Sequence, residues 1–205
     1  RNKIGGVSYT LNANFSIINN KVLNLGLGNV EQLNGMVGNG SNLFIGCPME
    51  LYYGYKTDGV FLDQADIDSW YNQKKVTPSA KPGDIRYKDI SGPDGVPDGV
   101  IDPNYDRVPL GSRIPKYTFG LNLGIDYKGF DFQAQFQGVA GVKGLLNEYS
   151  GFAFWSEGNI QRWQADGRFS PNNPQRYPDY PRLENLGNVV GPNTQTSDFW
   201  ILDAS

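Results

Sequence analysis

The chain has 205 residues, which is enough for one ordinary domain or for part of a larger one. Its 18 basic and 21 acidic residues give a formal net charge of −3, so no basic patch that would bind nucleic acid is expected. The chain contains no histidine, which excludes Ser-His-Asp catalysis, Cys-His catalysis and histidine zinc sites within it, and its single Cys47 cannot form an internal disulfide. Its 26 glycines, 13 prolines, 11 phenylalanines, 12 tyrosines and 4 tryptophans favour strands, turns and long loops.

Apolar and polar residues alternate from Val7 to Ile17, with Leu11 and Phe15 on one side of the segment and Asn12 on the other. A period of two places successive side chains on opposite faces of a strand. The sequence therefore predicts a strand over residues 7–17 with two unlike faces.

The same alternation runs over residues 117–127 and resumes at Phe130, after the turn residues Lys128 and Gly129. It predicts a hairpin of two long strands over residues 117–138. The polar side of this hairpin holds amides, threonine, glycine and two aspartates but no lysine or arginine, and its apolar side has aromatic rings toward the ends and aliphatic residues nearer the middle. Two interpretations stay open: a lipid-facing band of a membrane barrel between aromatic girdles, or a half-buried hairpin of a soluble protein.

Two long polar segments, residues 18–116 and 139–197, separate these strands, whereas the hairpin turn is short. No apolar run reaches the roughly 18 residues of a membrane-spanning helix, but a transmembrane strand needs only about 10 alternating residues. Short turns on one side and long loops on the other are typical of an outer-membrane barrel, whose long loops are extracellular. Residues 198–205 are expected to begin another strand. Three strands and part of a fourth cannot close a barrel, so we expect this chain to be a piece of a larger protein.

Short helices are expected inside the long segments. The first segment predicts a helix from Gln64 to Gln73, with Asp63 or Asp66 as its N-cap. The second predicts a helical turn or two between Glu157 and Ala165.

A series of short motifs follows in order along the chain. The motifs are GYKTDGVF at Gly54–Phe61, PGDIRYKD at Pro82–Asp89, DGVID at Asp98–Asp102, Asp106-Arg107, Leu110-Gly111, IPKYTFG at Ile114–Gly120, YKGFD at Tyr127–Asp131 and DFWILDAS at Asp198–Ser205. Together they resemble the C-terminal part of a SusC/RagA-type TonB-linked outer-membrane protein, and the resemblance extends over nearly the whole chain.

The resemblance implies an all-β fold, namely an antiparallel segment of a 22-stranded transmembrane β-barrel with long extracellular loops that contain short helices. It also implies a TonB-dependent importer of oligosaccharides or peptides in the outer membrane of a Gram-negative cell, surrounded by lipid and paired with a SusD-like surface lipoprotein. TonB would act through an N-terminal region and plug that are not recognisable in this chain. The rival interpretation is a soluble β-sandwich module that binds carbohydrate or acts as an adhesin.

A candidate calcium loop runs from Asp94 to Tyr105. It places Asp94, Asp98 and Asp102 at positions one, five and nine and Gly99 at position six of a twelve-residue calcium loop, where hard oxygen ligands surround a glycine turn. Positions three and twelve carry no carboxylate, so other oxygens would have to replace them. The candidates for that replacement are Asp89, Ser91 and Asp106. The alternative is a pair of Asp-Gly turns in a proline-rich loop.

Aromatic residues of the second long segment are candidates for contact with a substrate, because flat rings stack on sugars and grip peptide side chains. The residues expected at this site are Tyr149, Trp155, Trp163, Tyr177 and Tyr180. The alternative is that most of these rings pack a small core of the loop itself.

No enzymatic activity is expected. Paired carboxylates such as Asp66 and Asp68, or Asp179 and Glu184, could supply the acid and nucleophile of a glycosidase. Nothing in the sequence marks a raised pKa at either pair, and carboxylates in an acidic loop are usually only solvated.

Overall fold

The computed structural model describes residues 2–24, 43–185 and 189–205 and divides into two compact units. The strand unit comprises Arg1–Leu51, Gly111–Gly144 and Asp203–Ser205, and the loop unit comprises Tyr52–Leu110 and Leu145–Leu202. Residues 25–42 and 186–188 of the expected long loops lie outside the described residues. The regular structure is mostly strand and the main sheet is antiparallel, so the expected all-β class is confirmed. None of the described helices has both the length and the apolar character needed to span a membrane.

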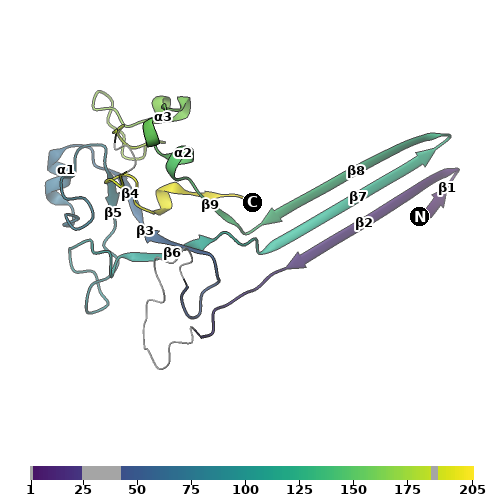
Figure 1. Cartoon of the computed structure of the whole chain (residues 1–205), viewed down its shortest axis with the longest axis horizontal. Coiled ribbons are helices and arrows are strands. Elements are labelled where there is room, and N and C mark those ends of the chain that lie inside the picture. The colour runs from purple at the N-terminus through teal and green to yellow at the C-terminus, as the bar shows by residue number, and fades with distance from the viewer. Residues whose placement is uncertain (1, 25–42, 186–188) are drawn as a thin grey trace. The chain divides into compact units, whose positions relative to one another are not determined.

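The strand unit is built on a four-stranded antiparallel sheet in the order β1-β2-β7-β8 (Figure 1). Strand β2, Val7–Ile17, covers the residues of the first expected strand. Strands β7, Tyr117–Tyr127, and β8, Phe130–Ala140, form the expected hairpin, and β8 continues two residues beyond its expected end at residue 138. A short strand that the sequence pattern did not indicate, β1, Asn2–Ile4, pairs with the start of β2.

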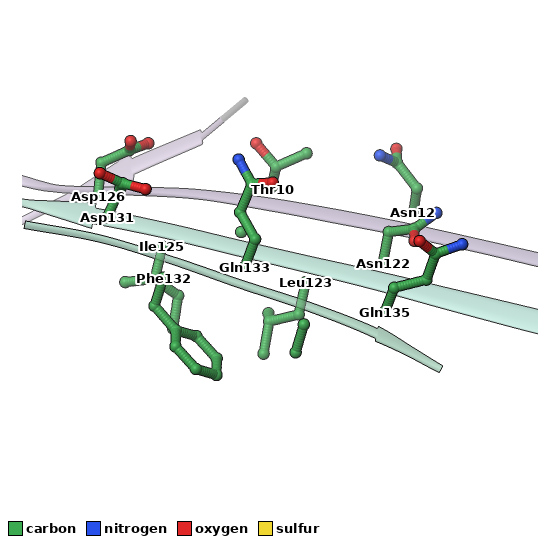
Figure 2. A pocket seen from close by; sticks show the side chains of 12 residues that line it. Thr10, Asn12, Asn122, Leu123, Ile125, Asp126, Asp131, Phe132, Gln133 and Gln135 are labelled. Carbon is green, nitrogen blue, oxygen red and sulfur yellow. The ribbon is translucent and has the colours of Figure 1, made fainter. Parts of the chain in front are cut away.

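The register of the sheet sorts side chains of like polarity into rows. Asn12 pairs with Asn122, which pairs with Gln135, and the adjacent apolar row joins Leu11, Leu123 and Ala134. Because side chains alternate along each strand, successive rows lie on opposite faces. Figure 2 shows this separation, with amides and carboxylates on one side of the sheet and Leu123, Ile125 and Phe132 on the other.

The apolar face of this sheet is exposed. Phe130 is 81% exposed, Leu11 and Phe15 are each 61% exposed, and Phe132 and Phe136 are each 58% exposed. Burial of such side chains is what normally drives a strand to pack, and a large exposed apolar patch marks a surface that another apolar phase covers. The residues are therefore arranged as a sheet with one face for water and one for an apolar environment.

Short strands and helices interrupt the two long segments. Strand β3 pairs with β6, β4 with β5, and β9 with β10. The bounds are β3 Leu51–Tyr55, β4 Thr57–Val60, α1 Gln64–Ser69, β5 Ile85–Tyr87, β6 Arg107–Ser112, β9 Lys143–Leu145, α2 Glu148–Gly151, the 3-10 turn η1 Trp155–Glu157, α3 Arg162–Gly167, the 3-10 turn η2 Asp198–Trp200 and β10 Ile201–Asp203.

The expected helices are present but differ in length. Asp63 caps α1, as predicted, by accepting a hydrogen bond of 2.8 Å from the Asp66 N–H. The helix ends at Ser69 rather than Gln73, because the chain becomes extended at Trp70 and the Asn72 N–H and carbonyl bond to the backbone of residues 99 and 101. The helical turn expected between residues 157 and 165 is divided into η1 and α3, since residues 156 and 157 adopt left-handed conformations that a regular helix excludes.

One hydrophobic core serves both parts of the loop unit, Tyr52–Leu110 (the first excursion) and Leu145–Leu202 (the second excursion). Val60, Ile85 and Tyr87 of the first excursion pack with Tyr180 and Trp200 of the second. The remaining buried members of this cluster are Tyr55, Ile101, Ala153 and Phe169. The two excursions therefore fold as a single body rather than as separate loops.

Burial of Trp200 changes the expected strand at residues 198–205. Its side chain is 1% exposed, its ring stacks edge-on against Tyr180 at 5.6 Å, and its Nε1–H donates to the Asn193 carbonyl at 2.8 Å. The chain forms the turn η2 to bring this ring inward, so the strand begins only at Ile201.

The glycines of the first motif allow the two excursions to touch. A Cβ atom at Gly54 would lie 2.1 Å from the Thr196 carbonyl oxygen, and one at Gly59 would lie 2.1 Å from the Arg176 carbonyl oxygen. The neighbouring amides use these same carbonyls: Tyr55 donates to Thr196 at 3.0 Å. Only glycine permits backbones to approach this closely, which gives the motif a physical reason.

Candidate functional site

The polar face of the strand unit forms a hollow of about 530 Å³ along β2, β7 and β8 (Figure 2). Its polar lining consists of Thr10, Asn12, Asn122, Asp126, Asp131, Gln133 and Gln135. Amide and hydroxyl groups both donate and accept hydrogen bonds, so this surface can solvate a neutral polar molecule without holding it by charge. The two aspartates pair directly across the strands beside the β7–β8 turn, and the same row continues through Ser8 to Lys3 of β1.

Two of the aromatic residues predicted to contact substrate, Tyr149 and Trp163, are linked through Gln161, and Trp163 contacts a third, Tyr180. Its side-chain carbonyl accepts from Trp163 Nε1–H at 2.7 Å, and its amide donates to the Tyr149 carbonyl at 3.1 Å. Trp163 packs edge-on against Tyr180 at 5.5 Å. Tyr180 is only 5% exposed and belongs to the core, which leaves its ring no free face for a ligand. Tyr149 and Trp163 stay accessible, at 64% and 38% exposure.

The other two predicted aromatics lie in different surroundings. Trp155 is half-buried and packs edge-on against Phe152 at 5.5 Å, so part of its ring belongs to the packing of the loop unit. Tyr177 is 70% exposed, and its hydroxyl donates to Asp58 Oδ1 at 3.2 Å. Tyr180 and part of Trp155 therefore pack within the loop unit, as the alternative interpretation expects. Substrate contact by the exposed rings stays a prediction.

Most of the carboxylates predicted to bind calcium already accept hydrogen bonds from the protein. Asp106 is fully buried and accepts from three backbone N–H groups, those of Ile90, Ser91 and Asp102, at 2.6 to 3.1 Å. The Asp102 carboxylate pairs with Lys75, and Asp98 accepts from the Val100 N–H at 2.9 Å. Asp89 Oδ2 accepts from the Gly99 N–H at 2.6 Å.

Within the described ranges, no three acidic or cysteine side chains are gathered in a way that could hold a metal ion. One oxygen stands out, because Asp89 Oδ1 is buried without a hydrogen-bond partner in this part of the structure. Burial raises the pKa of Asp89 more than the bond from Gly99 lowers it, and the negative charges of Asp106 and Asp98 raise it further. Several carboxylates therefore lie close together between residues 89 and 106. Asp94, which was predicted as the first calcium ligand, lies in an exposed turn.

A buried ion-pair cluster, which the sequence patterns did not reveal, joins the two excursions. Arg86 pairs with Asp58 and, at 2.9 Å, with Asp66 Oδ1, while Arg176 of the second excursion donates to Asp66 Oδ2. The Arg86 guanidinium lies 3.8 Å from the centre of the Trp70 ring. The sequence does contain one indication of this cluster, because Arg86 lies between the apolar residues Ile85 and Tyr87. An arginine buried among apolar neighbours must be paired with an acidic group.

The charges of this cluster shift the pKa of Asp66. Burial alone would raise it, but hydrogen bonds from Arg176 and the Leu62 N–H, together with the charges of Arg176 and Arg86, outweigh burial and hold the pKa of Asp66 below its ordinary value. Asp66 is therefore ionised throughout the neutral range and acts as a structural anion.

A second buried cluster surrounds Asp84, which is fully buried. Its Oδ1 accepts from Arg182 Nε–H at 2.5 Å and from Asn193 Nδ2–H at 2.8 Å. Glu184 accepts from the same arginine and the same asparagine, and burial, followed by the charge of Asp84, raises its pKa in spite of the arginine. Glu184 therefore takes part in the hydrogen bonds that stabilise the loop unit. It was one member of the Asp179 and Glu184 pair considered for hydrolysis.

A curated TonB-dependent receptor of Formosa agariphila is 30% identical to this chain over 168 residues, a match that covers 80% of the chain. This similarity supports membership of the TonB-dependent receptor family. The chain spans 16% of the length of that receptor. No family model matches the chain. An all-β fragment with long, folded excursions agrees with a segment of a TonB-dependent receptor.

Replacement of Asp66 tests the ion-pair cluster. Because its pKa is lower in the folded than in the unfolded state, Asp66 stabilises the loop unit fully above the ordinary aspartate pKa of about 3.9, and the stabilisation is lost as the pH falls through the folded value. Asp66→Asn should lower the stability of the loop unit by roughly 3 kcal/mol at neutral pH and flatten its decline in acid. The measurement is amide hydrogen exchange of β4 and β5 in the full-length protein across pH.

Asp68→Asn is the matched control, since Asp68 lies exposed on the same helix and should change stability by less than about 0.5 kcal/mol. Equal exchange in the two variants at every pH would contradict the assigned role of Asp66.

Proposed function

We propose that this chain forms part of the wall and of the outward-facing loops of a TonB-dependent importer in the outer membrane of a Gram-negative cell. The observation that carries the proposal is the exposed apolar face of β2, β7 and β8, opposite a polar face to which these three strands contribute no lysine or arginine. Hydrocarbon would cover the apolar face, and the polar face would line the lumen of the barrel. Family membership supports an import function in general.

The finer assignment is to the SusC/RagA type, which takes up oligosaccharides or peptides together with a SusD-like surface lipoprotein. It is supported by the order of the motifs from Gly54 to Ser205. In this proposal the loop unit faces the cell exterior and meets substrate and lipoprotein, while TonB acts through a region outside this chain. The chain itself carries out no chemistry.

The physical basis of capture would be a rigid loop unit. Its single core and the Arg86 and Asp84 clusters tie both excursions together, so binding would cost little conformational entropy. Exposed rings such as Tyr149 and Tyr177 would supply contact area on this body. Once released inward, a neutral polar substrate would meet the amides of the polar sheet face.

Calcium binding at residues 89–106 is a separate proposal. It is supported by the unpartnered oxygen of Asp89, which an oxygen-seeking cation would satisfy. The proposal predicts that millimolar calcium slows hydrogen exchange of residues 89–106 in the chelator-treated full-length protein, and that Asp89→Asn removes this effect. Identical exchange with calcium and with chelator would reject it.

The facing of the sheet is tested by two arginine substitutions at neighbouring positions of β7. Leu123→Arg would place a cation on the proposed lipid face and should block membrane assembly of the full-length protein, because such a charge costs about 2 to 4 kcal/mol at the bilayer midplane. Asn122→Arg would place the same cation in the lumen and should assemble like the wild type. The measurement is the amount of heat-modifiable, folded protein in outer-membrane fractions.

Equal assembly of the two variants would contradict the assigned faces. Recovery of the wild type as a monomer that unfolds cooperatively in water without detergent would favour the rival, a soluble carbohydrate-binding or adhesin module.

A further inference from the structure

A groove beside helix α1, which none of the functions above uses, has the size of a ligand site. Its volume is about 470 Å³, within the usual range of about 300 to 1,000 Å³ for small-molecule pockets. The groove is lined by residues of α1, by Phe61 and by the turn-rich segment of residues 70–80. All of the residues that line this α1 groove belong to the loop unit.

The lining of the α1 groove includes an aromatic pair. The rings of Trp70 and Tyr71 lie 4.7 Å apart and are tilted by 58°. Trp70 is fixed, because its Nε1–H donates to the Tyr87 carbonyl at 2.9 Å and Arg86 covers its ring at 3.8 Å. Tyr71 is 43% exposed. The anchored tryptophan thus positions a tyrosine ring at the surface of the groove.

The wall of the groove is also held rigidly. Gln73 is 4% exposed and uses its whole amide inside the protein: it donates to the Ile85 carbonyl at 3.1 Å and to Thr77 Oγ1 at 3.2 Å, and it accepts from the Tyr87 N–H at 3.1 Å. A site whose supporting residues are locked in this way needs little reorganisation to bind a ligand.

Helix α1 contributes two planar polar side chains, Gln64 and Asp68, to the lining of the groove. Gln64 and Asp68 are both exposed, and the Gln64 amide donates to Asp68 Oδ1 at 2.8 Å, which aligns the two groups. Between them they offer amide N–H donors and carboxylate and carbonyl acceptors to a ligand. Asp68 and Lys74 are the charged residues among those that line the groove, so the lining has no net charge.

We propose that the α1 groove binds a neutral oligosaccharide, with one sugar ring stacked on Tyr71 and vicinal hydroxyls bonded to Gln64 and Asp68. The apolar C–H face of a pyranose matches an exposed aromatic ring, and adjacent hydroxyls match a paired amide and carboxylate. A neutral lining disfavours a strongly charged glycan. This inference names the substrate class of the importer and therefore rests on the proposed function.

A peptide fits this groove less well. Extended peptides are commonly bound by hydrogen bonding to the edge of a strand. The lining residues lie in α1 or in the segments around it, and the described strands contribute none of them. Peptide binding is accordingly the competing outcome of the test.

The test is isothermal titration of the detergent-solubilised full-length protein with defined probes. These are the hexasaccharides of β-1,4-glucan, β-1,3-glucan, α-1,4-glucan and β-1,4-mannan, hexagalacturonate as an acidic glycan, and hexaalanine as a peptide. At least one neutral hexasaccharide should bind. Tyr71→Ala should weaken that binding by about tenfold or more, whereas Tyr71→Phe, which keeps the ring, should stay within about threefold of wild type.

Tyr105→Ala is the matched control, because Tyr105 has a similar exposure of 41% in the same unit but does not line the groove, and its affinity should be unchanged. The inference is overturned if no neutral hexasaccharide binds, if only hexagalacturonate or hexaalanine binds, or if Tyr71→Ala binds like the wild type. Membrane assembly of the Leu123→Arg and Asn122→Arg variants reports on the importer independently, so failure of the groove leaves that result intact.

Discussion

The structure depends on one constraint: a single sheet must satisfy two different surroundings at once. Across β2, β7 and β8 the register mostly pairs polar residues with polar ones, as in the row of Asn12, and apolar residues with apolar ones, as in the row of Leu11. The pair of Thr118 and Val139 is an exception. Strand β7 has a hydrogen-bonded neighbour on both sides, so its side chains decide the environment of each face. The apolar face is suited to contact with hydrocarbon and the polar face to contact with water. This difference between the faces is the basis for proposing that the sheet belongs to a barrel wall.

The two excursions are stabilised differently from the sheet, because they bury a hydrophobic core of their own. Together they share one hydrophobic core around Tyr87 and Trp200. Close backbone contacts at Gly54 and Gly59 and the Arg86–Asp66–Arg176 ion pairs fasten the two segments to each other. Consequently, a change in one excursion should affect the stability of the other, even where a surface such as the α1 groove is lined by the first excursion alone.

How far the sequence predicts the structure differs between the units. Strict alternation gave β2, β7 and β8 nearly to the residue, and Lys128-Gly129 adopts the left-handed conformations of a tight hairpin turn. Strand β5 was missed because all of its residues are buried, so it shows no alternation. The early end of α1 and the burial of Tyr180 depend on tertiary contacts of Trp70 and Trp200, which local pattern cannot supply. The α1 groove was missed as well, since its wall is fixed by contacts of Gln73 with Ile85 and Tyr87, which local pattern does not predict.

The most direct test of the two-surroundings account is spin-label accessibility along β7 in the full-length protein reconstituted in lipid. Single labels would be placed at consecutive positions from Leu121 to Ile125 after Cys47 has been replaced by serine. The account predicts that labels at odd-numbered positions collide with oxygen, which concentrates in hydrocarbon, and that labels at even-numbered positions collide with a water-soluble nickel chelate. Odd-numbered labels that are immobile and shielded from both reagents would show that protein covers this face, and would contradict the account.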